Sequence, residues 1–263
     1  MSNSKSNETL YTFEGMTSVS ALIKALETNP CARKIKKIIF DEAKKSANYS
    51  RIKFLRAKSE ELGFALEARS EEYINSITEG NTHGGFVAFC EQKNYPSLTS
   101  EEIKNDGVYF LLEGIEDPFN FGYTLRSLYT AGVDGIILPP RNWTECTAVV
   151  CRSSAGASEL ANIYVQDLCE AAQMLKSKGF RILCANIKDS ESLYEADLAA
   201  PLAFVIGGEK RGISRNLLDA SDGNVRIDYA VDFKGSLPTA SAATLIAFEC
   251  AKTNNKFNKM LLN

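Results

Sequence analysis

The sequence is poor in the residues on which many hydrolases and metal sites depend. It contains one histidine, His83, and no Gly-x-Ser-x-Gly motif, so a Ser-His-Asp hydrolase would have to use that single residue. Its seven cysteines are scattered and form no Cys-x-x-Cys pair, which is typical of free thiols in a reducing cytoplasm. We therefore expect no metal site, and we expect His83 in a loop, contacting RNA or backbone or without a role.

Long apolar runs are also missing. No stretch of 18 or more apolar residues occurs, which predicts that no segment spans a membrane. The first ten residues are polar and do not resemble a secretory signal, so we predict a cytoplasmic protein. At 263 residues the chain is long enough for one large domain or two ordinary ones.

An excess of positive charge is missing overall but present locally. The formal net charge is −3, which does not by itself indicate a nucleic-acid-binding protein. Residues 33–58, however, contain ten Lys and Arg against two acidic residues, a net charge of +8. Such a segment can bind phosphates by displacing counterions, or it can be the solvated face of a helix. Charge alone leaves these two interpretations open.

A polar segment at 92–106 carries a proline and little periodicity, so it is interpreted as a linker between two domains, 1–95 and 106–263. The first domain is predicted to be a small α/β unit. Its expected helices are 17–28, 47–62 and 70–77, with Ser70 as a helix start, and its expected strands are 35–41, 64–69 and 84–90.

Strands and helices alternate after the linker, which predicts a mainly parallel sheet covered on both faces. The expected strands are 107–115, 134–139, 180–187, 201–208 and 225–229, and the expected helices are 119–131, 165–179, 214–220 and 240–252. Ligands of such sheets bind at the carboxyl ends of the strands. Glycine-rich or polar segments collect there, at 113–122, 206–212 and 235–239.

Three of these segments contain candidate functional residues. In the first, Asp117-Pro118 breaks the preceding strand, Asn120 occupies an N-cap position, and Arg126 lies in the following helix. The second, 205–218, lacks the Gly-Lys-Ser/Thr of a phosphate loop and the spacing of a dinucleotide fingerprint. The third, 235–249, leads from small residues into a helix. Each segment alone is a weak signal, and a tight turn or close packing would explain it equally well.

In this order and spacing, the segments resemble the SpoU (TrmH-like) branch of the SPOUT methyltransferases, which methylate the ribose 2'-hydroxyl of rRNA or tRNA. The matching positions are Asn120, Gly122, Arg126, Ala131-Gly132, Ser154-Ala155-Gly156-Ala157, Gly207, Glu209, Gly212, Ser236 and Leu237. The match covers about 107–252, and the first domain, ending in Thr82–Phe89, resembles the family's RNA-binding domain.

The resemblance implies an α/β fold in which a SPOUT-type parallel sheet contains a deep C-terminal trefoil knot, beside a small N-terminal α/β RNA-binding domain. It also implies S-adenosylmethionine as cofactor, RNA as substrate, and a homodimer that shares its sites between subunits. The implied catalytic residues are Arg126, Asn120, Ser236 and Glu209. The implied cofactor-binding residues are Ile206, Gly207, Gly208, Ile227, Tyr229, Leu237 and Pro238.

In this role Arg126 clamps a phosphate or stabilises the developing alkoxide, because a guanidinium stays protonated, while Asn120 and Ser236 orient it or the ribose. The sequence departs from the family at Pro238, where an Asn is usual, at Ala240, and at Asp228, which adds an acidic group near the expected cofactor pocket. These departures favour a second hypothesis, an RNA-binding module that keeps the fold and has impaired or lost catalysis.

Overall fold

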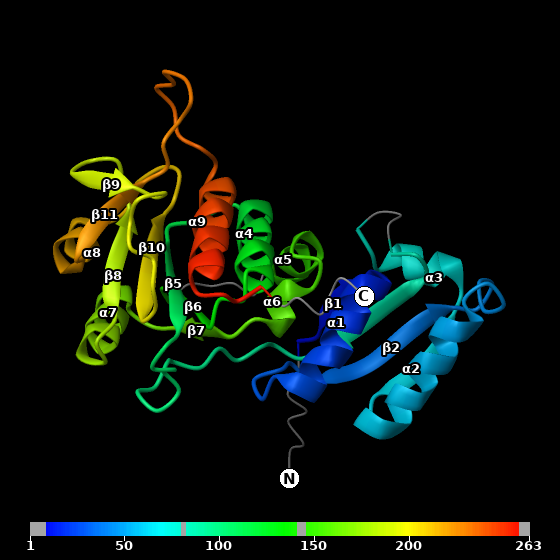
Figure 1. Ribbon diagram of the computed structural model, residues 1–263. Helices are drawn as coiled ribbons and strands as arrows, with labels where there is room; N and C mark the ends of the chain where they lie inside the picture. The colour runs from blue at the N-terminus through cyan, green and yellow to red at the C-terminus, as the bar shows by residue number, and fades with distance from the viewer. Residues whose placement is uncertain (1–8, 80–82, 141–145, 258–263) are drawn as a thin grey trace, which may run out of the picture. The chain divides into compact units, whose positions relative to one another are not determined.

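The computed structural model describes residues 9–79, 83–140 and 146–257. Its chain forms two compact units, shown in Figure 1 and described separately below. The first contains Met1–Asn94 together with Trp143–Leu160, and the second contains Tyr95–Asn142 together with Ala161–Asn263. The predicted domains follow the linear sequence instead, so that 143–160 fall in the second of them; that division stays a prediction.

A four-stranded mixed sheet forms the centre of the first unit, in the order β1-β4-β2-β3. Only β2 and β3 pair in parallel. The strands are β1 (Tyr11–Glu14), β2 (Ile35–Asp41), β3 (Ala65–Arg69) and β4 (Phe86–Cys90), and the helices are α1 (Gly15–Thr28), α2 (Tyr49–Leu62) and α3 (Glu71–Ser76). Because successive strand residues point to opposite faces, Ile38 packs with α1 and α2, whereas Ile39 packs with Ile74 of α3.

Two short helices from later in the chain, α5 (Thr147–Ser153) and α6 (Ala157–Leu160), complete the first unit. Cys151 of α5 is fully buried in the core of that unit. Gly156, between the two helices, has φ +87°, and a Cβ there would lie 2.2 Å from Cβ of Ala21 in α1. Only glycine therefore lets this segment approach α1 so closely.

The second unit contains a seven-stranded sheet in the order β7-β6-β5-β10-β8-β11-β9, and every strand pair is parallel. The strands are β5 (Val108–Glu113), β6 (Gly135–Leu138), β7 (Ile163–Val165), β8 (Arg181–Ala185), β9 (Ser190–Ser192), β10 (Leu202–Gly207) and β11 (Gly223–Arg226). The helices are α4 (Pro118–Thr130), α7 (Leu168–Ser177), α8 (Arg215–Ala220) and α9 (Thr239–Thr253). The predicted parallel sheet is confirmed.

Helices cover both faces of this sheet (Figure 1). Tyr109 and Leu111 of β5 point into a core that includes Leu175 of α7 and Leu217 of α8. The alternate residue Phe110 points to the other face, where it stacks on Phe204 of β10 with ring centroids 6.0 Å apart. Helices α4 and α9 pack together on that side and are joined by a hydrogen bond between the hydroxyls of Thr244 and Ser127 (2.6 Å).

The prediction missed β1, the three-residue strands β7 and β9, and helices α5 and α6. It also placed the strand at 225–229 two residues too late, because β11 ends at Arg226 and leaves Ile227 and Tyr229 in the following loop. The trefoil knot stays a prediction. Within the described ranges, no helix is long and apolar enough to cross a membrane.

Candidate functional site

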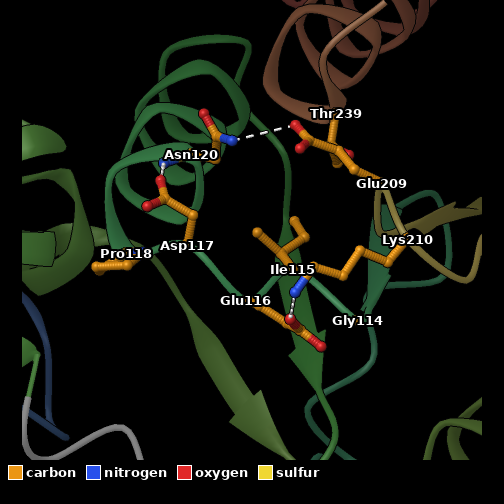
Figure 2. A pocket seen from close by; sticks show the side chains of 9 residues that line it. All are labelled: Gly114, Ile115, Glu116, Asp117, Pro118, Asn120, Glu209, Lys210 and Thr239. Atoms are coloured by element: carbon orange, nitrogen blue, oxygen red, sulfur yellow. Dashed lines mark hydrogen bonds and ion pairs between the residues drawn. The ribbon is translucent and has the colours of Figure 1, made fainter. Parts of the chain in front are cut away.

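Two cavities in the second unit lie where strands of the parallel sheet end. The first, of about 340 Å³, lies beside the segments that follow β5 and β10. Its lining consists of Gly114, Ile115, Glu116, Asp117, Pro118, Asn120, Glu209, Lys210 and Thr239, shown in Figure 2. The second, of about 720 Å³, lies beside the segments that follow β8 and β11. Both positions agree with the expectation that ligands bind at the carboxyl ends of parallel strands.

The first cavity brings two of the predicted catalytic residues together. The side-chain amide of Asn120 donates to Oε1 of Glu209 at 3.1 Å, although the two residues are far apart in sequence (Figure 2). This hydrogen bond joins the first turn of α4 to the turn after β10. Lys210, next in the chain, pairs with Glu116 on the opposite wall at 2.6 Å. The charged side chains that line the cavity are therefore largely paired.

The predicted N-cap of α4 was wrong. Asp117, not Asn120, is the N-cap, and its carboxylate accepts from the backbone N–H of Asn120 at 2.7 Å. Pro118 occupies the first helical turn, where a backbone N–H would have no partner within the helix, so proline loses no hydrogen bond there. Because Asp117 performs the capping, the side chain of Asn120 can reach Glu209.

Gly207 and Gly208 pack against backbone. A Cβ at Gly208 would lie 2.0 Å from the carbonyl oxygen of Gly114, and one at Gly207 would lie 2.4 Å from the carbonyl carbon of Gly212. The N–H of Gly212 donates back to the Gly208 carbonyl at 3.0 Å, which closes a tight turn. The two glycines thus hold Glu209 and Lys210 against the end of β5.

Gly208→Ala should lower the free energy of unfolding by about 1–3 kcal/mol, because the added methyl group overpacks a site walled by backbone that cannot rotate away. Gly223→Ala is the matched control, since its Cβ would meet only Leu183 at 3.6 Å, an ordinary contact, and it should change stability by less. Urea denaturation of both variants measures the difference. Equal losses in the two variants would contradict the close approach of Gly208 to Gly114.

The second cavity collects other predicted residues. Ile227, Tyr229, Ser236 and Leu237 line it together with Asp228, and α9 contributes Ala242 and Ile246. The hydroxyl of Tyr229 accepts from the backbone N–H of Leu237 at 3.0 Å, which ties the two ends of the intervening loop together. Within the described part of the chain, residues 228–236 make no backbone-to-backbone hydrogen bond. Their peptide groups are thus open to a ligand or to water.

Asp228 contributes a charge to this cavity, and that charge is balanced. Its carboxylate lies 2.7 Å from Nε of Arg226. The hydrogen bond from Ser192 and the neighbouring Arg226 lower the pKa of Asp228 below its ordinary value. The group therefore stays ionised at neutral pH, and its pairing with Arg226 reduces the negative potential that it would otherwise impose.

Pro238 is the N-cap of α9, with φ −52° and ψ 142°. This backbone conformation suits proline, and its carbonyl still accepts from the N–H of Ala242 at 3.0 Å. Substitution of an amide residue by proline at this place therefore costs the backbone little. What the chain lacks here is the amide side chain.

The remaining predicted residues lie apart from these cavities. Arg126 lies on an exposed face of α4, lines neither cavity, and makes no side-chain hydrogen bond or ion pair within the described residues. Ile206 is buried in the sheet. Gly207 and Gly208 precede Glu209 of the first cavity, and Pro238 follows Leu237 of the second, but none of the three lines either cavity. The chain by itself therefore does not bring Arg126 to Asn120, Glu209 or Ser236.

Two findings add to the sequence-based picture of the sites. The first cavity is also lined by Glu116, Asp117, Lys210 and Thr239, none of which was among the predicted catalytic or cofactor-binding residues. Their places directly after strands or before α9 are a signal that could have identified them. His83 is buried and closes a loop: Nδ1 accepts from the N–H of Gly85 at 3.1 Å, and Nε2 lies 3.0 Å from Asn75 Oδ1. Of the alternatives left open for His83, the structure shows the backbone contact.

Comparisons with known proteins agree with this geometry. The profile of the SpoU rRNA Methylase family matches residues 107–248, and that of the RNA 2'-O ribose methyltransferase substrate binding family matches residues 14–96. The 23S rRNA (guanosine-2'-O-)-methyltransferase RlmB of Shewanella oneidensis is 31% identical over 195 residues, which are 72% of this chain and 79% of that protein.

Solved structures show the same fold at low identity. An AdoMet-bound rRNA methyltransferase from Sinorhizobium meliloti superposes with a TM-score of 0.75 at 22% identity, covering 92% of this chain and 87% of that one. The SpoU methyltransferase AviRb from Streptomyces viridochromogenes, in complex with AdoMet, gives a TM-score of 0.74 at 17% identity, covering 92% and 89%.

Proposed function

Because the chain belongs to the SpoU rRNA Methylase family, a family of S-adenosylmethionine-dependent RNA 2'-O-ribose methyltransferases, we propose that it methylates a ribose 2'-hydroxyl of structured rRNA or tRNA. The observation that carries this proposal is the second cavity, where predicted cofactor-binding residues Ile227, Tyr229 and Leu237 form a wall. The resemblance inferred from the ordered motifs is confirmed.

The residues around the second cavity fit S-adenosylmethionine. Its volume of about 720 Å³ suits a nucleoside with an amino-acid tail, since ligand cavities typically measure about 300–1,000 Å³. Ile227, Leu237 and Ile246 offer apolar contact, and the open peptide groups of 228–236 offer hydrogen bonds to an adenine or an α-amino acid. When bound, the cofactor supplies an electrophilic methyl group on a sulfonium.

The protein's own task is to position and to stabilise charge. A ribose 2'-hydroxyl is a weak nucleophile at neutral pH, so it must be held in line and its developing negative charge must be balanced. In the proposed mechanism the guanidinium of Arg126 provides that balance or clamps the adjacent phosphate. Asn120, held by Glu209, and Ser236 orient the ribose.

Arg126 reaches such a site if two copies of the chain associate, and we include a homodimer in the proposal. The exposed surface of α4 carries Phe119 and Tyr123 beside Arg126, and the adjacent helix α9 exposes Leu245 and Phe248. Large apolar side chains exposed on two packed helices are typical of a protein–protein interface. Burying it against a second copy would bring Arg126 of the partner subunit toward the cavities of the first.

We further propose that the protein acts in the cytoplasm. All seven cysteines are free, and burial raises the pKa of both Cys151 and Cys250 to about 12, which leaves these thiols unreactive.

The alternative function is an RNA-binding module without catalysis. It is favoured by one observation, the missing amide side chain at Pro238.

Calorimetric titration with S-adenosylhomocysteine separates the two functions without knowledge of the RNA. A methyltransferase should bind it with a Kd of about 1–100 μM, that is, with about 5–8 kcal/mol. Ala242→Leu should abolish the binding heat because its larger side chain projects from α9 into the space that the ligand would occupy, whereas Ser241→Leu, on the neighbouring exposed position, should preserve it. Absence of heat from folded wild-type protein would favour the binding module.

A further inference from the structure

The ten basic residues of 33–58 do not form one uniform patch. Four of them form ion pairs with carboxylates of the first unit. Arg33 pairs with Glu159, Lys36 with Glu91, Lys44 with Asp41 and Glu71, and Lys58 with Glu27 and Glu61. Arg33 is also buried. Much of the local net charge of +8 is therefore neutralised, and the question is where the remainder lies.

Three of the six cations that remain, Arg51, Lys53 and Arg56, lie on one helix, α2. Ile52 and Leu55 turn its inner side into the core, and the outer side exposes Tyr49, Lys53, Phe54 and Arg56. Tyr49, Lys53 and Arg56 follow one another at intervals of four and three residues, so they lie along one stripe of about 10 Å. Phe54, the next residue after Lys53, lies about 100° further round the exposed side of the helix. Within the described residues, neither Lys53 nor Arg56 has an ion pair.

Large aromatic side chains are exposed among these cations. Tyr49 is 67% exposed and Phe54 is 41% exposed, although an aromatic ring gains free energy when it leaves water. A surface that recognised only phosphates would not need them. Rings beside unpaired cations match single-stranded nucleic acid, in which free base faces stack on aromatics while the phosphates meet Lys and Arg. A duplex hides its base faces within its own stack.

We propose that the α2 surface, defined as Tyr49, Lys53, Phe54 and Arg56, binds an unpaired segment of the substrate RNA. This inference rests on the RNA substrate of the function proposed above. Tyr49 and Phe54 stack on bases, and Lys53 and Arg56 contact the backbone. Glu60 and Glu61 end the basic part of the helix, so the bound strand lies toward its N-terminal half. The first unit would then bind loops or bulges of the RNA in preference to continuous RNA duplexes.

Fluorescence anisotropy with the full chain tests this assignment, using labelled oligouridylate of about 12 nucleotides and a duplex of equal length as probes. Tyr49→Ala/Phe54→Ala should weaken oligouridylate binding by about 10-fold or more and leave duplex binding unchanged, since each lost stack is worth about 1–3 kcal/mol. Tyr49→Phe should bind like the wild type. All these positions are exposed, so the variants should fold.

Lys53→Ala/Arg56→Ala should weaken the binding of both probes. For the single strand, the slope of log affinity against log salt concentration should become less steep by about 1.4, or about 0.7 for each lost phosphate contact. The charge-matched control is Lys24→Ala/Lys178→Ala, two exposed lysines outside the α2 surface, and it should bind nearly as the wild type does. Wild-type affinity of the Tyr49→Ala/Phe54→Ala variant for oligouridylate, or an equal loss for both probes, would overturn the proposal.

Titration of the same variants with S-adenosylhomocysteine separates this inference from the proposed function. Unchanged cofactor-analogue binding with lost oligouridylate binding supports the α2 surface. A wild-type chain that binds the analogue but no oligouridylate overturns the α2 proposal alone. A chain that binds oligouridylate through α2 but not the analogue supports the α2 surface and counts against methyl transfer.

Discussion

Arg126→Ala is expected to lower methyl transfer to RNA by about 10²–10⁴-fold, the range seen when one group that stabilises transition-state charge is removed. The protein should otherwise be intact, because Arg126 is exposed and contacts neither cavity of its own chain. The assay measures incorporation of labelled methyl groups from S-adenosylmethionine into total RNA from cells that lack this protein. Arg126→Lys keeps the charge but not the planar fork, so it should recover only part of the activity.

A mixing experiment tests whether Arg126 acts across a subunit boundary. Arg126→Ala and Ala242→Leu protein should each be inactive alone, and S-adenosylhomocysteine should bind only the first. If the site is shared, equal mixing after dissociation gives heterodimers with one intact site, and activity returns to about one quarter of the wild-type value. No recovery, with heterodimers demonstrated, would place Arg126 in the site of its own chain. Full activity of Arg126→Ala alone would remove it from the mechanism.

Most of the correct predictions of fold and site came from the order and spacing of the sequence motifs. Alternating strands and helices predicted the parallel sheet, and the spacing of Asn120 and Glu209 along a family pattern anticipated two residues that the fold brings within 3.1 Å. Periodicity could not reveal β7 and β9, because a three-residue strand has no room for a repeat. Nor could local rules choose Asp117 over Asn120 as the N-cap, since both residue types cap helices.

Non-local packing was the main obstacle. The segment of α5 and α6 lies between strands of the second sheet in sequence, yet it packs in the first unit. The signals for this were single residues, Gly156 and Glu159, whose partners Ala21 and Arg33 are more than a hundred positions away. Likewise, a count of charges in 33–58 could not separate buried, paired cations from those on α2. Both distinctions need the positions of partners that a linear pattern does not contain.

Glu159 is the centre of the most deeply buried charge cluster among the described residues. Its carboxylate accepts from Nε of Arg33 at 2.9 Å and from Nη2 at 3.2 Å, while Nζ of Lys93 lies 3.9 Å away and donates to the Ser158 carbonyl. All three charged side chains are almost fully buried. Burial alone would raise the pKa of Glu159, but Lys93 and Arg33 lower it below its ordinary value. The cluster thus holds α6 against the start of β2.

Glu159→Gln should reduce the free energy of unfolding by about 3–5 kcal/mol, because it leaves two buried cations without a counter-charge. Glu91→Gln removes the half-exposed partner of Lys36 and should cost at most about 1 kcal/mol. Lys93→Met should cost far less than Glu159→Gln, since it leaves the Arg33–Glu159 pair balanced. Burial already lowers the pKa of Lys93, so its charge opposes folding. Urea denaturation at neutral pH ranks the three variants.

The pH dependence of these stabilities identifies the charge itself as the cause. A carboxyl group whose folded pKa is lowered contributes stability that is fully present above its unfolded pKa of about 4.5 and is lost as the pH falls through the folded pKa. The difference between wild type and Glu159→Gln should therefore be constant near neutrality and shrink in acid, where the wild-type carboxyl group also becomes neutral. A difference that persisted unchanged in acid would mean that the variant fails through packing, and it would contradict an electrostatic role for Glu159.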